Sequence, residues 1–197
     1  MGHCRCLRPA SWVNFSGSEL NNLRLIEKIS WELGRFNLSP DRLAVEVLES
    51  VISGAADDQI TLNINSLVAL GCHFDLDGFG TGHASISSIR RFKIDRLKID
   101  RSFVMKADRD PEQQRMISAV LTTAERLNLV TLAEGVETVG EDALLAQLGC
   151  NHVQEFGIGK PMPFNETLDW MQAHEDRLLG PPKSEGAKPG NQNNANT

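Results

Sequence analysis

Two kinds of segment alternate along the chain. Short apolar stretches end in a polar residue followed by turn residues, and longer stretches carry apolar residues every three or four positions. The short stretches predict β-strands, and the longer ones predict helices. The predicted strands cover residues 11–16, 43–50, 72–80, 96–104, 130–138 and 152–159. The predicted helices cover residues 18–36, 59–71, 83–92, 110–129, 140–149 and 165–179.

The helix predicted over residues 110–129 has the clearest signals at its start. Asp110 fits the N-cap position, Pro111 the first helical position, and Gln113 the position that closes a capping box. One face of this helix carries the apolar residues Met116, Ile117, Val120, Leu121, Ala124 and Leu127. Gly149 follows the next predicted helix at the place of a C-terminal glycine cap.

Six repeats of strand and helix imply an α/β fold with a parallel sheet, either open and doubly wound or closed as a barrel. Both architectures place functional groups at the carboxyl ends of the strands. The polar residues at the predicted strand ends are Asn14, Glu46, Glu49, Asp75, Asp77, Lys98, Asp100, Glu134, Glu137 and Gln154. An open sheet would spread this set across two edges, whereas a barrel gathers it on one rim. The pattern therefore favours a (β/α)8 barrel of the TIM type.

Carboxylates that meet at such a rim would raise one another's pKa unless a cation neutralises them. Only oxygen ligands are available there, from Asn14, Glu46, Asp77 and Glu134. This donor set favours Mg²⁺ or Mn²⁺ over zinc. Hard metals beside Lys98 and a glycine-rich loop point to hydrolysis of a phosphate ester. Taken singly, each residue has an ordinary structural alternative, such as capping a helix or forming a surface ion pair.

The glycine-rich loop "DGFGTGHAS" spans residues 77–85. Its glycines alone leave open whether it binds a phosphate, serves a metal or only turns the chain. His73 and His83 flank the loop but lie off the strand-end pattern, so we place both at the surface or behind the site. The residues His3, Cys4 and Cys6 are better explained by a frayed terminus than by a metal site.

Composition narrows the functional classes. The chain has 197 residues, 41% of them apolar, and a formal net charge of −6, which argues against generic nucleic-acid binding. No stretch approaches the roughly 20 apolar residues of a membrane span, and the N-terminus lacks a signal-peptide pattern. We therefore expect a cytoplasmic protein with reduced cysteines. We expect residues 1–11 to be non-native or frayed, residues 12–178 to form the domain, and residues 179–197 to be disordered.

Five stretches resemble the EAL domain family of phosphodiesterases, which open cyclic di-GMP to its linear dinucleotide. They are "WVNFSGSEL", "VEVLES", "DGFGTGHASISSIRRFKIDRLKIDRSFV", "AEGVET" and "GCNHVQEFGIGKPMP", and they follow the family's order from Trp12 to Pro163. The resemblance implies a (β/α)8 barrel that binds two Mg²⁺ or Mn²⁺ ions and cyclic di-GMP.

The resemblance also implies roles for individual residues. The implied metal ligands are Asn14, Glu46, Asp77 and Glu134. The implied catalytic residues are Lys98 beside the catalytic water, Glu134, and Glu49, which would steady the glycine loop. The implied substrate-binding residues are Gln154, Gly80 and Pro161.

Several positions depart from the family pattern. Gly78 stands where a second aspartate is usual, Leu48 where a threonine is usual, and Glu155 where a glycine is usual. The Glu-Ala-Leu signature, with its metal-binding glutamate and phosphate-binding arginine, belongs on a strand before residue 11. Without its tail the chain offers roughly 180 residues, whereas a full barrel usually needs about 250. By this pattern the barrel is incomplete, with its first two strands missing.

An incomplete barrel would leave two sheet edges unpaired, which predicts a homo-oligomer or pairing with an upstream segment. Two functional interpretations stay open. The first is a metal-dependent cyclic di-GMP phosphodiesterase whose activity is weak or lost. The second is a catalytically degenerate EAL module that acts as a cyclic di-GMP sensor or a protein-interaction domain. An unrelated metal-dependent barrel is the third interpretation, and it requires the central motif match to be accidental.

Overall fold

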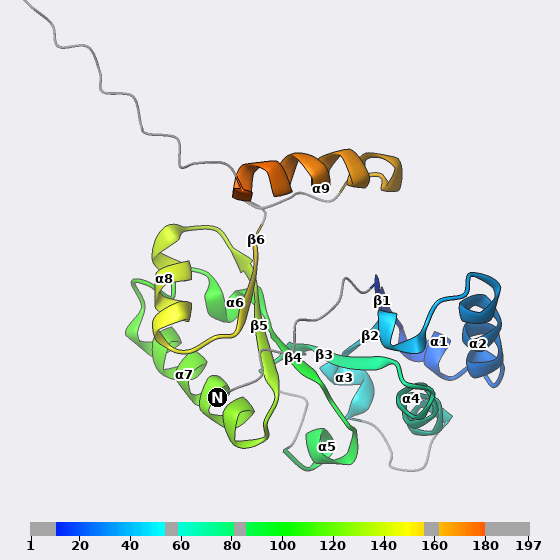
Figure 1. Cartoon of the computed structure of the whole chain (residues 1–197). Helices are drawn as coiled ribbons and strands as arrows, with labels where there is room; N and C mark the ends of the chain where they lie inside the picture. The colour runs from blue at the N-terminus through cyan, green and yellow to red at the C-terminus, as the bar shows by residue number, and fades with distance from the viewer. Residues whose placement is uncertain (1–10, 54–58, 81–85, 156–161, 180–197) are drawn as a thin grey trace, which may run out of the picture. The chain divides into compact units, whose positions relative to one another are not determined.

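The computed structural model describes residues 11–53, 59–80, 86–155 and 162–179. Within these residues, six parallel strands form one sheet, and their order in space is their order along the chain (Figure 1). A sheet that winds in one direction is typical of a barrel, whereas a doubly wound sheet reverses its strand order. The strands are β1 (Ser11–Asn14), β2 (Leu43–Leu48), β3 (His73–Phe79), β4 (Arg96–Ile99), β5 (Val130–Val136) and β6 (His152–Glu155).

All six predicted strands are confirmed, and so is the expectation of an incomplete α/β barrel. β1 and β6 form the two edges of the described sheet, so each of them pairs with one neighbour. The consequence predicted from these edges, association with another chain or segment, stays a prediction.

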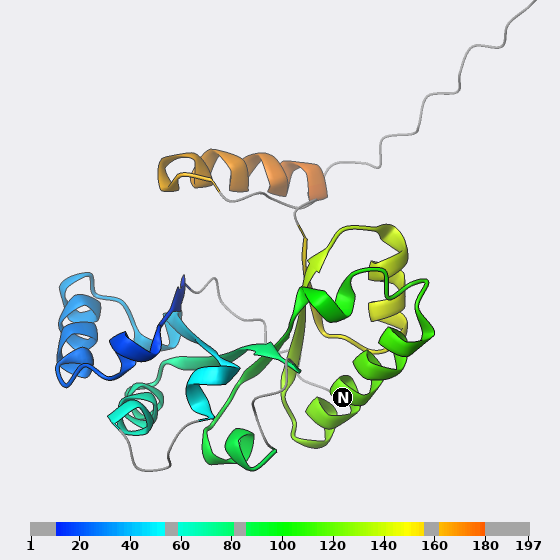
Figure 2. The same ribbon diagram turned by 180° about the vertical axis from the view of Figure 1, so that it is seen from behind.

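Helices follow the strands in regular alternation. α2 and α4 lie beside β1 to β3, and α7 and α8 lie beside β4 to β6 (Figures 1 and 2). The helical segments of the sheet-bearing part are α1 (Gly17–Leu20), α2 (Leu25–Arg35), η1 (Pro40–Arg42), α3 (Glu49–Ile52), α4 (Gln59–Leu70), α5 (Ile86–Arg91), α6 (Arg101–Val104), α7 (Pro111–Arg126) and α8 (Val139–Gln147).

The strands are shorter than the sequence pattern predicted. In β2 and β4 the reason is a short helix that begins at or next to the strand end. α3 begins at Glu49, immediately after β2. α6 begins at Arg101, and Asp100 caps it by accepting a hydrogen bond from the backbone N–H of Ser102 at 2.8 Å. These turns of helix hold the strand-end residues in a fixed backbone conformation.

The predictions for α7 hold in part. Asp110 is its N-cap and accepts from the N–H groups of Glu112 and Gln113, with Pro111 in the first turn. The Gln113 amide, however, faces the carbonyl oxygens of Phe103 in α6 and of Met105 directly after it, instead of closing a capping box. Met116 is 45% exposed, so the predicted apolar face is narrower than the spacing indicated.

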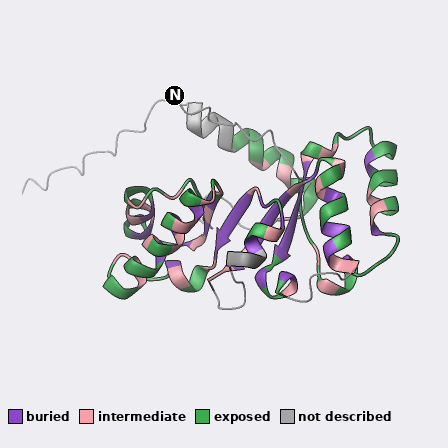
Figure 3. Ribbon diagram, turned by 90° about the horizontal axis from the view of Figure 1, so that it is seen from below, coloured by how far each residue is buried: buried purple, intermediate pink, exposed green. Residues whose placement is uncertain are grey.

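The two faces of the sheet have different compositions. Residues at alternate positions of β2, β3 and β4 pack against the helices, and the buried ones are Leu43, Val45, Val47, Phe74, Leu76, Leu97 and Ile99. Figure 3 shows the buried strands beneath helices that are exposed on their outer sides. The intervening positions carry the polar residues, because successive side chains of a strand point to opposite faces.

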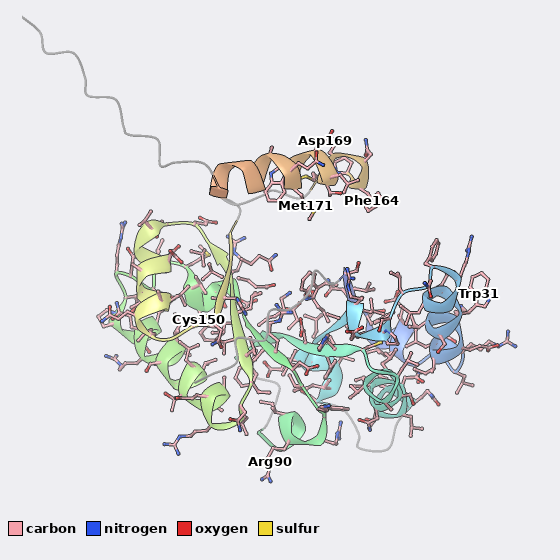
Figure 4. All side chains as sticks on the ribbon, in the orientation of Figure 1. Trp31, Arg90, Cys150, Phe164, Asp169 and Met171 are labelled. Carbon is pink, nitrogen blue, oxygen red and sulfur yellow. The ribbon has the colours of Figure 1, made fainter. Side chains whose placement is uncertain are left out.

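The C-terminal helix α9 (Phe164–Leu179) belongs to a second compact unit, Lys160–Thr197, and is described by itself. Phe164 and Met171 lie on one side of it and are exposed, and Asp169 lies on the other side (Figure 4). In the part of the chain that the structure describes, no helix combines the length and apolar character needed to cross a bilayer.

Candidate functional site

Polar residues from neighbouring strands meet on the face of the sheet that the helices do not cover. Parallel pairing sets Asn14 of β1 opposite Glu46 of β2, and Glu134 of β5 opposite Gln154 of β6. Lys98 of β4 lies between them in strand order. The carboxyl ends of five strands thus deliver these residues to one region, as the alternation of the sequence predicted.

Lys98 is the centre of this cluster. Its Nζ lies 3.1 Å from Oε1 of Glu46, 3.9 Å from Oδ1 of Asp77 and 2.5 Å from Oε1 of Glu134. Lys98 is 5% exposed. One ammonium therefore faces three carboxylates from three other strands, and the ionised cluster has a net charge of −2, one positive against three negative. That excess negative charge is the electrostatic condition that attracts a cation.

The pKa values of the cluster reflect burial and charge. Burial alone lowers the pKa of Lys98, but the hydrogen bond with Glu134 and the charges of Glu134, Glu46 and Asp77 outweigh it. The net pKa of Lys98 is raised, so its ammonium keeps its charge at neutral pH. Burial raises the pKa of Glu134, Lys98 lowers it, and the charges of Asp77 and Glu46 raise it again, leaving it above its usual value.

Asp77 stands at an irregularity in β3. The register between β3 and β4 shifts between Leu76 and Phe79, and Gly78 has φ +70°, a left-handed conformation that side chains other than glycine rarely adopt. This bulge turns the strand directly after Asp77. Among the described residues, a Cβ atom at Gly78 would meet Cδ2 of Leu48 at an ordinary 3.8 Å.

Glu49 contacts the beginning of the glycine loop. Its Oε2 accepts a hydrogen bond from the N–H of Gly80 at 2.9 Å, and Glu49 is 3% exposed. Gly80 has φ +102°, and an added Cβ would lie 2.9 Å from Cε2 of Phe103. Position 80 therefore requires glycine for both its conformation and its space.

The structure brings together four of the residues predicted from the sequence, namely Glu46, Asp77, Lys98 and Glu134. Asn14 pairs in register with Glu46, and Gln154 pairs in register with Glu134; both Asn14 and Gln154 are exposed. His73 lies elsewhere, with Nδ1 3.2 Å from Oδ2 of Asp95. Pro161, His83, residues 81–85, and His3, Cys4 and Cys6 lie outside the described residues.

A second polar group lies beside the cluster. The sequence analysis placed Asp75 at a strand end but did not predict its contacts with Trp12 and Arg96. Asp75 is 1% exposed, and its Oδ2 accepts hydrogen bonds from the indole N–H of Trp12 at 3.1 Å and from Arg96 at 3.0 Å. Burial raises the pKa of Asp75, Arg96 lowers it, and Glu46 raises it, for a net upward shift. Alternation could have placed Trp12 with Asn14 and Arg96 with Lys98 on one face, but not their contact across the sheet.

The donor chemistry of the main cluster fits a hard divalent cation. All its acceptors are carboxylate oxygens, with an amide oxygen available from Asn14, and such ligands suit Mg²⁺ or Mn²⁺. Among the described residues, no group of three or more His, Cys, Asp or Glu side chains is already arranged to hold a metal ion. The carboxylates instead surround the ammonium of Lys98. The residues thus match a metal in chemistry and charge, and their hydrogen bonds with Lys98 compete with it.

Comparisons with known proteins agree with this arrangement. A model of the EAL domain matches residues 7–161. The bifunctional diguanylate cyclase/cyclic di-GMP phosphodiesterase MucR of Pseudomonas aeruginosa is 35% identical over 162 residues, which cover 81% of this chain and 24% of MucR. The chain thus spans about a quarter of the length of that relative.

Solved structures of related domains have the same fold. The PaMucR phosphodiesterase in complex with c-di-GMP superposes with a TM-score of 0.75 at 34% identity, covering 80% of this chain and 64% of that one. The manganese/cyclic di-GMP complex of Klebsiella pneumoniae BlrP1 superposes with a TM-score of 0.69 at 26% identity, covering 75% and 37%. The second of these is a related domain that binds both a metal and the nucleotide.

Proposed function

Because this chain belongs to the EAL domain family, we propose that its strand-end cluster is a metal-dependent cyclic di-GMP site, and that the chain is a phosphodiesterase module with weakened turnover. The observation that carries the proposal is the burial of Lys98 among Glu46, Asp77 and Glu134. A surface ion pair needs no such convergence of four strands, whereas a site for phosphoryl chemistry needs both the carboxylates and a cationic group.

The residues that would hold a metal are Asn14, Glu46, Asp77 and Glu134. A bound Mg²⁺ or Mn²⁺ supplies an activated water and offsets the charge of the phosphoryl oxygens. Lys98, charged at neutral pH, would donate hydrogen bonds to the attacking water or to a phosphoryl oxygen and so stabilise the negative charge of the transition state. The product is the linear dinucleotide, with one phosphodiester bond opened by water.

Other residues shape the site around the nucleotide. Glu49 accepts a hydrogen bond from the N–H of Gly80 and so fixes the backbone at the end of β3, where the glycine loop begins. Gln154 beside Glu134 offers an exposed amide for hydrogen bonding to the nucleotide. Pro161 completes the proposed substrate-binding set. The contacts and positions of Glu49 and Gln154 support their roles, whereas Pro161 lies outside the described residues and its role rests on family membership alone.

Gly78 favours weak turnover and supports a second candidate function. A hydrogen atom replaces the carboxylate that the family pattern places beside Asp77, and a cation with fewer carboxylate ligands binds more weakly. The second candidate is therefore a degenerate module that binds cyclic di-GMP as a sensor without hydrolysing it.

Chromatography of the nucleotides tests the proposal. The purified chain is incubated for hours with cyclic di-GMP and Mn²⁺, beside a Glu134→Gln variant as the control. Slow formation of the linear dinucleotide by the original chain, absent from the variant, is the expected result. Binding of cyclic di-GMP without product would favour the sensor. A folded chain that neither binds nor hydrolyses the nucleotide would contradict both.

A further inference from the structure

The edge strand β1 carries Asn14, yet the strand itself is weakly held. All four of its residues are exposed, and it pairs with β2 alone in the described sheet. A short strand with hydrogen bonds on one side frays more readily than a central one. A metal ligand at such a position needs an anchor, because a ligand that moves contributes little to affinity.

Trp12, two residues before Asn14, supplies a contact that crosses the sheet. Its indole N–H donates to Oδ2 of Asp75 at 3.1 Å, although Asp75 belongs to β3 and not to the adjacent strand. Arg96 of β4 donates to the same oxygen at 3.0 Å, and its guanidinium lies 5.4 Å from the centroid of the Trp12 ring. Ala44, which pairs with Trp12 in register, has a side chain short enough for the indole to pass over β2.

We propose that Trp12, Asp75 and Arg96 form a clamp that positions Asn14 for the metal. The clamp joins β1, β3 and β4, so the twist of the edge strand is set by the buried strands. Trp12 and Asn14 lie on the same face because they are two residues apart. Asn14 is registered with Glu46, and the N–H of Phe15 donates to the carbonyl oxygen of Glu46 at 3.0 Å.

The energetics of the buried pair argue for a geometric role. Asp75 is 1% and Arg96 is 7% exposed. Within the described residues, Oδ1 of Asp75 and Nε of Arg96 are buried without a hydrogen-bond partner. Such atoms make a buried ion pair a poor source of stability, while the geometry it imposes is specific. Here the ion pair with Arg96 holds Oδ2 of Asp75 where it accepts the hydrogen bond from the Trp12 indole.

The experiment compares Trp12→Phe with Trp31→Phe. Phenylalanine keeps an aromatic ring at position 12 but removes the N–H donor. Trp31 is a matched control because it is a 60% exposed tryptophan on the outer side of α2, far from the cluster (Figure 4). Hydrogen exchange at the Phe15 amide reports whether β1 opens. We expect Trp12→Phe to speed this exchange about tenfold, the effect of losing one hydrogen bond to a charged group, and Trp31→Phe to leave it unchanged.

A metal titration separates positioning from simple stabilisation. Mn²⁺ affinity is measured for Trp12→Phe, Asn14→Ala and the double variant, with the unfolding midpoint recorded for each. We expect Trp12→Phe to weaken Mn²⁺ binding about threefold to tenfold, and to add little in the Asn14→Ala background, because coupled residues are not additive. Additive losses, or equal effects of Trp12→Phe and Trp31→Phe, would overturn the clamp.

The inference rests on the proposed function where it treats Asn14 as a ligand, and the two readouts keep the two claims apart. An original chain that binds no Mn²⁺ would contradict the metal site. The clamp would then be tested by hydrogen exchange of the Phe15 amide alone, since that hydrogen bond exists without a metal. Exchange that Trp12→Phe does not speed would overturn it.

Discussion

Replacing Gly78 with aspartate adds one carboxylate next to Asp77, and the structure predicts two opposing effects. The first is conformational. Gly78 has φ +70°, which costs a residue with a side chain roughly 1–2 kcal/mol. The space is sufficient, because an added Cβ would lie 3.8 Å from Leu48. For a chain of this size, that cost lowers the melting temperature by roughly 2–8 °C. The metal-free Gly78→Asp variant is therefore expected to be less stable than the original chain.

The second effect concerns the metal. A fourth carboxylate makes the cluster more negative and supplies another oxygen ligand, so Mn²⁺ affinity is expected to rise on the order of tenfold or more, comparable to the changes produced by residues that support metal ligands. Saturating Mn²⁺ is then expected to raise the melting temperature of Gly78→Asp more than that of the original chain, because a ligand that binds the folded state stabilises it.

Gly78→Ala is the matched control for this prediction. Alanine has a conformational cost at φ +70° at least as large as that of aspartate, which tolerates the left-handed region better, but alanine adds no oxygen. Differential scanning calorimetry with and without Mn²⁺, together with a direct Mn²⁺ titration, distinguishes the two variants. Equal Mn²⁺ affinities for Gly78→Asp and Gly78→Ala would refute the reasoning that position 78 lies within reach of a bound cation.

Three further substitutions test the structure. Lys98→Met leaves three carboxylates without their ammonium and is expected to destabilise the chain by about 3–5 kcal/mol in urea unfolding; an unchanged midpoint would contradict the buried cluster. Gly80→Ala places a Cβ 2.9 Å from the Phe103 ring at φ +102°, and a loss of about 2 kcal/mol is expected in thermal unfolding, whereas full stability would show that the loop leaves β3 differently. Burial raises the pKa of Glu141, but backbone N–H donors outweigh it and hold that pKa below its usual 4.5; the donors are Glu137, Lys106 and Thr138. Because a lowered carboxyl pKa stabilises the folded state above the unfolded pKa, Glu141→Gln is expected to cost about 2 kcal/mol at pH 7. That difference shrinks as the pH falls from 4.5 through the lower folded pKa, and a difference independent of pH would contradict the assignment.

Much of the fold could be predicted from local patterns. Alternating apolar and polar positions identified all six strands, and the polar residues at their ends predicted that Glu46, Lys98 and Glu134 would meet. This succeeded because parallel strands of a barrel-type sheet bring their carboxyl ends to one rim. The same patterns could not place the strand ends, since Glu49 and Arg101 begin short helices where the apolar run continues.

Contacts between strands that are not adjacent could not be predicted. The bond from Trp12 to Asp75 depends on the register of β1 with β2 and of β2 with β3, and no local pattern encodes either. The Gln113 side chain likewise bonds to carbonyl oxygens at the end of α6, those of Phe103 and Met105, instead of to its own helix start. In both cases a tertiary contact outweighed the local preference that the sequence displayed.

The most direct test of the central claim is a titration of the chain with cyclic di-GMP, with and without Mn²⁺, beside an Asp77→Asn variant. If the cluster around Lys98 is a metal-dependent nucleotide site, Mn²⁺ strengthens the binding of cyclic di-GMP, and by linkage cyclic di-GMP strengthens the binding of Mn²⁺. Asp77→Asn is expected to lose most of this coupling. Binding of cyclic di-GMP that is the same with and without Mn²⁺, or that Asp77→Asn leaves unchanged, would contradict the account.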